Sequence, residues 1–281
     1  MTNTYKLLFA AALALAPAVV LAGTPCTRDG SGAITVTAQC ATTPQAYDVT
    51  IYKLGLCTAN PALAANPDFS SCAMLIDGAG QLAHLVAGSS VVLSASSVPR
   101  HGTYGFAVMV ASNSIGITST QRYDTAQTGA AGGPGGTTCW SVAGTVDREN
   151  PPPSLVACGS TPTPGVTIDK LSHFSNGGAH DPSAGGTFNG LSSTVAVVGG
   201  SMNAKLATSS LATAVAADWP SAITRLIAVQ TFSAGVRTDA ATRGLDVAFD
   251  VSNSSTPWID NGTGALRQYG TGPFSMVITT R

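Results

Sequence analysis

The stretch AYDVTIYKLGLC, residues 46–57, has the composition of a β-strand, but its apolar pattern changes phase halfway. The alternating apolar residues from Tyr47 to Ile51 would share one face of an extended chain, whereas from Tyr52 onward the apolar positions fall on the other face. Such a change indicates either a bulge near Tyr52 and Lys53 or a central strand that is buried on both faces. Either interpretation makes this stretch a core element of a sheet.

Period-two alternation predicts further strands along the chain. The clearest is LDVAFDVS, residues 245–252, in which apolar and mostly polar positions alternate. Residues 103–110 and the C-terminal FSMVITTR, residues 274–281, show the same pattern, and turn signals rich in Gly, Pro and Asn separate the strands. We therefore predict an all-β fold, mainly an antiparallel β-sandwich or a barrel-like fold, with at most one short helix.

Two segments depart from the strand pattern. Residues 201–218 are rich in Ala and Leu and are the candidate for the short helix. Residues 125–190 contain Gly- and Pro-rich runs that exclude central strands, so we interpret them as a long loop-rich insertion. We predict a single β-rich domain over residues 23–281. The alternative is two β domains split near residue 160, but neither half alone has the complete set of about seven strands.

The first 22 residues, MTNTYKLLFAAALALAPAVVLA, have the order of a cleaved secretory signal peptide. A positive charge at Lys6 precedes an apolar core that Pro17 interrupts, and the ending at Ala22 suits signal peptidase. The uninterrupted apolar stretch is shorter than the ~20 residues that a spanning helix needs. We expect a secreted, extracellular or cell-surface protein without an integral membrane segment after cleavage, and the periplasm is the alternative location.

The cysteines predict a disulfide framework. An even number of cysteines in a chain bound for an oxidising compartment indicates three disulfide bonds. We favour pairing in chain order, because each such pair brackets an excursion rich in Gly, Pro or Asn. Zinc binding is less favoured, since the sequence has no Cys-x-x-Cys motif and no histidine at finger spacing. The predicted pairs are Cys26 with Cys40, Cys57 with Cys72, and Cys139 with Cys158.

The densest group of side chains that could carry chemistry is HFSNGGAHDP, residues 173–182. His173, His180 and Asp181, with Asp169 upstream, are weak candidates for a divalent-metal site or a general acid–base pair. The spacing of the histidines matches no familiar ligand motif, so a solvated loop is the simpler interpretation. The sequence also lacks Gly-x-Ser-x-Gly and His-Glu-x-x-His motifs. We therefore predict no cofactor and do not favour an enzyme.

Charge and composition narrow the class of partner. Charged residues make up 10% of the chain and the formal net charge is −1, so there is no basic stripe for nucleic acid. A signal peptide followed by a weakly charged β domain rich in Ser, Thr and Gly is similar in general composition to many bacterial surface and fibre subunits. Few charges also leave sheet edges with few residues that oppose pairing with another chain.

We predict a secreted or cell-surface structural or adhesive protein, a self-associating surface or fibre subunit. The predicted assembly strand is the C-terminal one, with Phe274, Met276 and Ile278 on one face, because it could complete a neighbour's sheet by strand addition. The partners would be other copies or other surface proteins. The alternatives are an extracellular ligand- or glycan-binding module that uses residues 125–190 for recognition, and a secreted hydrolase.

Overall fold

A computed structural model describes residues 24–35, 40–62, 65–87, 90–91, 99–147, 154–174, 191–215, 218, 221–260 and 263–281. The predicted signal peptide, His180 and Asp181 lie outside the described residues. Within these ranges the chain forms mainly antiparallel sheets, no α-helix and three disulfide bonds, which confirms the predicted all-β fold.

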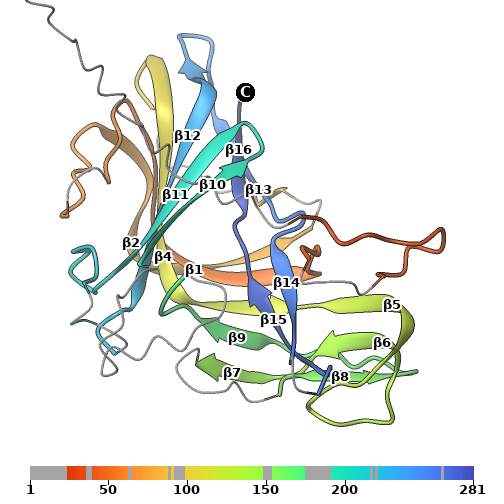
Figure 1. Ribbon diagram of the computed structural model, residues 1–281. Coiled ribbons are helices and arrows are strands. Elements are labelled where there is room, and N and C mark those ends of the chain that lie inside the picture. The colour runs from red at the N-terminus through yellow and green to blue at the C-terminus, as the bar shows by residue number, and fades with distance from the viewer. Residues whose placement is uncertain are drawn as a thin grey trace, which may run out of the picture.

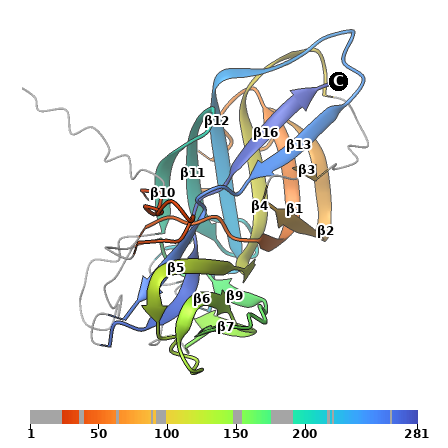
Figure 2. The same cartoon turned by 90° about the vertical axis from the view of Figure 1, so that its right-hand side faces the viewer.

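A large sheet is the framework of the molecule. Its strands run in the spatial order β10-β11-β12-β4-β1-β2, and Figure 2 shows them from β10 at one margin to β2 at the other. The short strand β9 pairs with the end of β4, and β7 pairs with β9 in parallel. The bounds are β1 Ala46–Cys57, β2 Cys72–Val86, β4 Gly102–Thr118, β7 Gly144–Asp147, β9 Thr167–Lys170, β10 Ser192–Val197, β11 Gly200–Ala207 and β12 Arg225–Thr238.

Three smaller sheets complete the fold. The sheet β16-β13-β3 packs against the large sheet as the second layer of a sandwich, and the other two sheets lie at one end of the sandwich, below it in Figure 1. We call this end the base. The bounds are β3 Ser90–Val91, β13 Leu245–Asp250 and β16 Ser275–Thr280 for the second layer, and β5 Thr120–Gln127, β6 Gly136–Ser141, β8 Val156–Gly159, β14 Ser255–Ile259 and β15 Leu266–Thr271 for the base.

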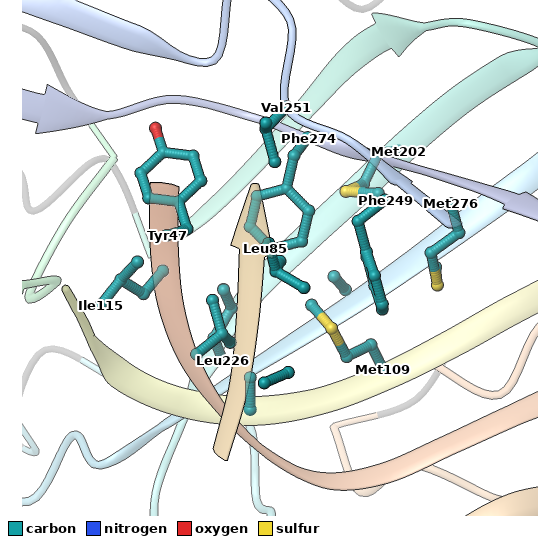
Figure 3. Close-up of a cluster of buried hydrophobic side chains, with 14 of the residues drawn as sticks. Tyr47, Leu85, Met109, Ile115, Met202, Leu226, Phe249, Val251, Phe274 and Met276 are labelled. Atoms are coloured by element: carbon teal, nitrogen blue, oxygen red, sulfur yellow. The ribbon is translucent and has the colours of Figure 1, made fainter. Parts of the chain in front are cut away.

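The core lies between the large sheet and the second layer. Figure 3 shows side chains from both layers meeting there, among them Tyr47, Met109 and Phe274. The Phe274 ring lies 5.9 Å from the ring of Tyr47 and 6.0 Å from that of Phe249, measured between centroids. Because these aromatic residues come from β1, β13 and the chain entering β16, their burial holds the two layers together.

The stretch AYDVTIYKLGLC is β1, and both interpretations of its phase change apply. The strand lies between β2 and β4. On the β4 side Ile51 and Lys53 pair with the consecutive residues Ala111 and Val110, so Tyr52 forms a bulge. The bulge returns Leu54 to the face that Ile51 occupies, and both side chains are fully buried in the core.

The other face of the large sheet is buried too. Val108 of β4 and Ile227 of β12 contribute to a second cluster of buried side chains on that face. Ala62 and Phe69 cover this cluster from the segment between β1 and β2, which the Cys57–Cys72 disulfide closes. Burial on both faces explains why apolar residues occupy consecutive positions in the middle of β4.

The predicted helix over residues 201–218 is wrong at its start. Residues 200–207 form β11, in which the buried Met202 and Leu206 face the core and the backbone pairs with β10 and β12. Pairing on both sides outweighs the helix propensity of the alanines. The expected insertion over 125–190 contains β6 to β9 in its described part, and its residues 148–153 and 175–190 lie outside the described residues.

Candidate assembly edges

The predicted assembly strand, β16, packs its apolar face into the core of its own chain. Phe274 and Met276 are buried and Ile278 is partly buried against the same cluster. On one side β16 pairs with β13, and it ends the order of its sheet on the other side. Any assembly through β16 would therefore use its main-chain edge, since its inward side chains are already packed.

Hydrogen bonds at the chain end show which groups of β16 face outward. Arg281 and Gly244 exchange two main-chain bonds, at 3.0 Å and 3.1 Å. In an antiparallel pair, bonded and non-bonded positions alternate, so the N–H and C=O groups of Met276, Ile278 and Thr280 point away from β13. The outer edge of β16 thus offers three residues for a further strand.

A buried glutamine occupies the first of these three positions. Gln230 of β12 is 1% exposed, and its side chain reaches across the sandwich to Met276. The Met276 N–H donates to Gln230 Oε1 at 2.7 Å, and Gln230 Nε2 donates to the Met276 carbonyl at 3.0 Å. The side-chain amide imitates a neighbouring strand, which satisfies the edge at Met276 and leaves Ile278 and Thr280 facing outward.

Segments outside the strands cover several edges of the base. Ile34 bonds to both sides of Tyr123 in β5, where its N–H donates to the Arg122 carbonyl and its carbonyl accepts from the Asp124 N–H. Similar single bridges cover β14 and β15. These two bridges are Thr42 with Ser255 and Gly129 with Leu266. The chain therefore uses its own backbone to occupy main-chain groups that a second chain could otherwise bind.

The margin of the large sheet at β2 is interrupted by a bulge. Three residues of β2, from Gly78 to Gly80, lie opposite Tyr52 alone, and Gly80 has a φ of +115°. A Cβ atom at Gly80 would lie 2.8 Å from Tyr52 Cε1, so only glycine fits there. The exposed residues of β2 also include Asp77, whose carboxylate pairs with Lys53. A bulge and charged side chains both oppose pairing with another strand.

The opposite margin, β10, has none of these features. Its sequence, SSTVAV, contains neither charge nor proline, and its ladder with β11 has no register shift. Within the part of the chain that the structure describes, no strand or bridge pairs with its other edge. Regular edges without charge, proline or a bulge lack the features that oppose pairing with other chains.

Two of the residues that the sequence analysis named as candidates for a metal or acid–base site, His173 and Asp169, are buried. His173 is 8% exposed, with its Nδ1 atom 3.2 Å from the hydroxyl of the fully buried Ser172. Asp169 is 1% exposed on β9, and its Oδ2 accepts bonds from the N–H and hydroxyl of Thr271 at 2.8 Å and 2.7 Å. The carboxylate of Asp169 therefore links β9 to β15.

The metal-site hypothesis stays a prediction, because His180 and Asp181 lie outside the described residues. Among the residues whose positions are described, no three His, Cys, Asp or Glu side chains gather closely enough to hold a metal ion.

Three tyrosines have shifted pKa values because they are buried. Burial raises the pKa of Tyr123 to about 12, opposed by its contact with the Tyr269 hydroxyl at 3.4 Å. Burial also raises the pKa of Tyr269 well above its usual value. Burial likewise raises the pKa of Tyr47, and the negative charge of Asp169 adds a smaller increase. The Tyr47 hydroxyl donates a hydrogen bond to the Ser254 carbonyl. These hydroxyls are structural groups in the core.

The disulfides link the cysteines in chain order, the pairing that the sequence favoured. Cys57 and Cys72 lie opposite each other in β1 and β2, and Cys139 and Cys158 do so in β6 and β8. Cys26 and Cys40 close a loop ahead of β1. No helix in the described residues has the length and apolar character required to cross a membrane.

No protein-family model, curated protein or solved structure matches this chain.

Proposed function

We propose that this chain is an extracellular structural or adhesive protein that associates with further copies as a surface or fibre subunit. The observation that supports it best is the contrast between edges. The base and β2 have edges that are covered or interrupted, whereas β10 and the outer half of β16 keep main-chain groups directed outward. In strand addition such groups supply the affinity.

The disulfides and the charge balance support the same function. Disulfide bonds persist in oxidising compartments outside the cytosol, and all six cysteines are paired. With charged residues at 10% of the chain, electrostatic repulsion between copies is small. Association through main-chain bonds would therefore meet little opposition.

The first test is whether the mature protein, residues 23–281, associates at all. Sedimentation velocity over a wide concentration range should show oligomers that grow with concentration. A protein that stays monomeric at every concentration would contradict the proposed function.

The second test concerns β16. Truncation of the C-terminal strand would remove the buried Phe274 and Met276, so Ile278→Pro is the better variant. The Ile278 N–H points away from β13, so proline there costs no bond within the chain. If β16 carries assembly, Ile278→Pro should reduce oligomer size. Val277→Thr is the matched control, because Val277 is 41% exposed on the outer face and its substitution leaves the edge intact.

A further inference from the structure

The outward groups of β10 can be identified from its ladder. The Leu206 N–H donates to the Leu191 carbonyl at 2.9 Å, and these residues lie opposite each other when the β10–β11 register is continued by one position. Because bonded positions alternate, Ser193, Val195 and Val197 bond toward β11. The main-chain groups of Ser192, Thr194 and Ala196 therefore point away from the sheet.

The side chains of β10 alternate between the two faces of the sheet. Val195 is buried in the core and Val197 packs against it. Thr194 is exposed on the other face, where its hydroxyl accepts a bond from Asn203 Nδ2 at 2.8 Å. The strand is thus anchored on its inner face, and no strand or bridge among the described residues pairs with its outer edge.

We propose that β10 pairs antiparallel with β10 of a second copy, about a two-fold axis centred on Thr194. The proposal rests on the proposed function and names the partner and the strand that carry it. In this register Thr194 faces Thr194 of the second copy, and Ser192 faces Ala196 in both directions. Each of the three pairs exchanges two main-chain hydrogen bonds, so every outward donor and acceptor of β10 is used.

Other registers are less favourable. A shift by two residues leaves one outward residue of each copy without a partner. A shift by one residue sets outward groups against inward ones, so the ladder cannot form. The Thr194-centred register is therefore the one that pairs the edge fully.

The side chains fit this register. On the inner face Ser193 faces Val195 of the second copy, and Leu191 faces Val197. The apolar residues at the two ends of the strand thus cover one another, and the Thr194 pair at the centre is a favourable cross-strand pair. No charged residue lies between Ser192 and Val197, so no like charges oppose each other.

A second β10 is also a better partner than the edge of β16. The β16 edge offers Ile278 and Thr280 after Gln230 has occupied Met276, which is two outward residues against three in β10. A self-complementary edge also gives the isologous contact typical of two-fold dimers.

Cysteine cross-linking tests the register. In the Thr194→Cys variant the two substituted side chains, one from each copy, would lie opposite each other in a bonded pair. The Cα atoms of such a pair are about 5.5 Å apart, so a disulfide can form between the copies. Ser192→Cys is the matched control, because two copies of residue 192 would lie about four residues apart along the strands, roughly 13 Å. Both positions are exposed and lie outside the native disulfides.

Under mild oxidation, Thr194→Cys should give a covalent dimer on a non-reducing gel and Ser192→Cys should stay monomeric. A mixture of Ser192→Cys with Ala196→Cys should cross-link again. Equal cross-linking of Thr194→Cys and Ser192→Cys, or none in either, would overturn the proposed register.

Charge variants test the interface independently. Thr194→Lys and Thr194→Glu should each lose the dimer in sedimentation velocity, because like charges then meet at the axis, and an equimolar mixture should restore it. Circular dichroism establishes that both variants are folded. If Thr194→Lys still associates as the wild type does, the β10 inference fails and the proposed function stands. If the wild type is strictly monomeric, both fail.

Discussion

Gln230 shows how one residue can determine where an edge ends. Its amide is the only group described at the β16 edge that supplies both a donor and an acceptor to Met276. Removal of both partners from a buried main-chain position costs about 1–3 kcal/mol per unsatisfied group. The side chain thus joins the two layers of the sandwich at the strand that was predicted to mediate assembly.

We expect Gln230→Leu to lower the free energy of unfolding by about 2–6 kcal/mol, because it leaves the N–H and C=O of Met276 buried without partners. Urea denaturation measures the change. The neighbouring exposed Thr231 provides the control, since Thr231→Ala should stay within about 0.5 kcal/mol of the wild type. Equal stability of Gln230→Leu and the wild type would show that the amide does not hold the edge.

The buried tyrosines predict a loss of stability in alkali. The pKa of Tyr123 is raised to about 12 in the folded protein, so above pH 10 the unfolded chain loses the phenolic proton first. The free energy of unfolding should then fall as pH rises from about 10 to about 12, by up to about 1.4 kcal/mol per pH unit for this group. Urea melts at several pH values, with Tyr123→Phe as the control, measure the slope. A slope unchanged in Tyr123→Phe would contradict the assignment.

At the scale of elements, the disulfide-closed segment between β1 and β2 covers the outer face of the large sheet. It places Ala62 and Phe69 over Val108 and Ile227. The large sheet is therefore buried on two faces at its centre, although a sandwich needs burial on only one.

We expect the double variant Cys57→Ser with Cys72→Ser to lose about 3 kcal/mol, the chain-entropy value for a loop of this size. Hydrogen exchange should speed up in β4 and β12 beneath the loosened segment, and remain unchanged in β6 and β8 under their own disulfide. A melting temperature of this variant equal to that of the wild type would contradict the prediction.

Alternation in the sequence was sufficient for β13 and β16, because one face of each strand is more deeply buried than the other. It was insufficient for β2, whose bulge at Gly80 breaks the pattern, and for β11, whose alanines resemble a helix. The candidate site depends on strand order, which no local pattern encodes. Nothing in the sequence around Gln230 indicates that Met276 lies across the sandwich, and the edge position of β10 follows only from the whole topology.

At the scale of the molecule, weak charge distinguishes the proposed association from an electrostatic one. We expect the oligomer fraction of the wild type to change little between low salt and about 1 M salt, because main-chain bonds and apolar contacts are not screened. Sedimentation velocity at several salt concentrations measures it. Dissociation at high salt would indicate that charged side chains hold the copies together.

The central pairing of the large sheet also sets an order of events in time. Ser112 of β4 pairs with Arg225 of β12, and 225 minus 112 places them 113 positions apart in the chain. Because a chain is synthesised from its N-terminus, β4 has to wait for its partner β12 until most of the chain has been made. Strand β10 becomes the margin of a sheet only after β12 has docked. A newly made copy therefore cannot present that edge to another before its own core is nearly complete.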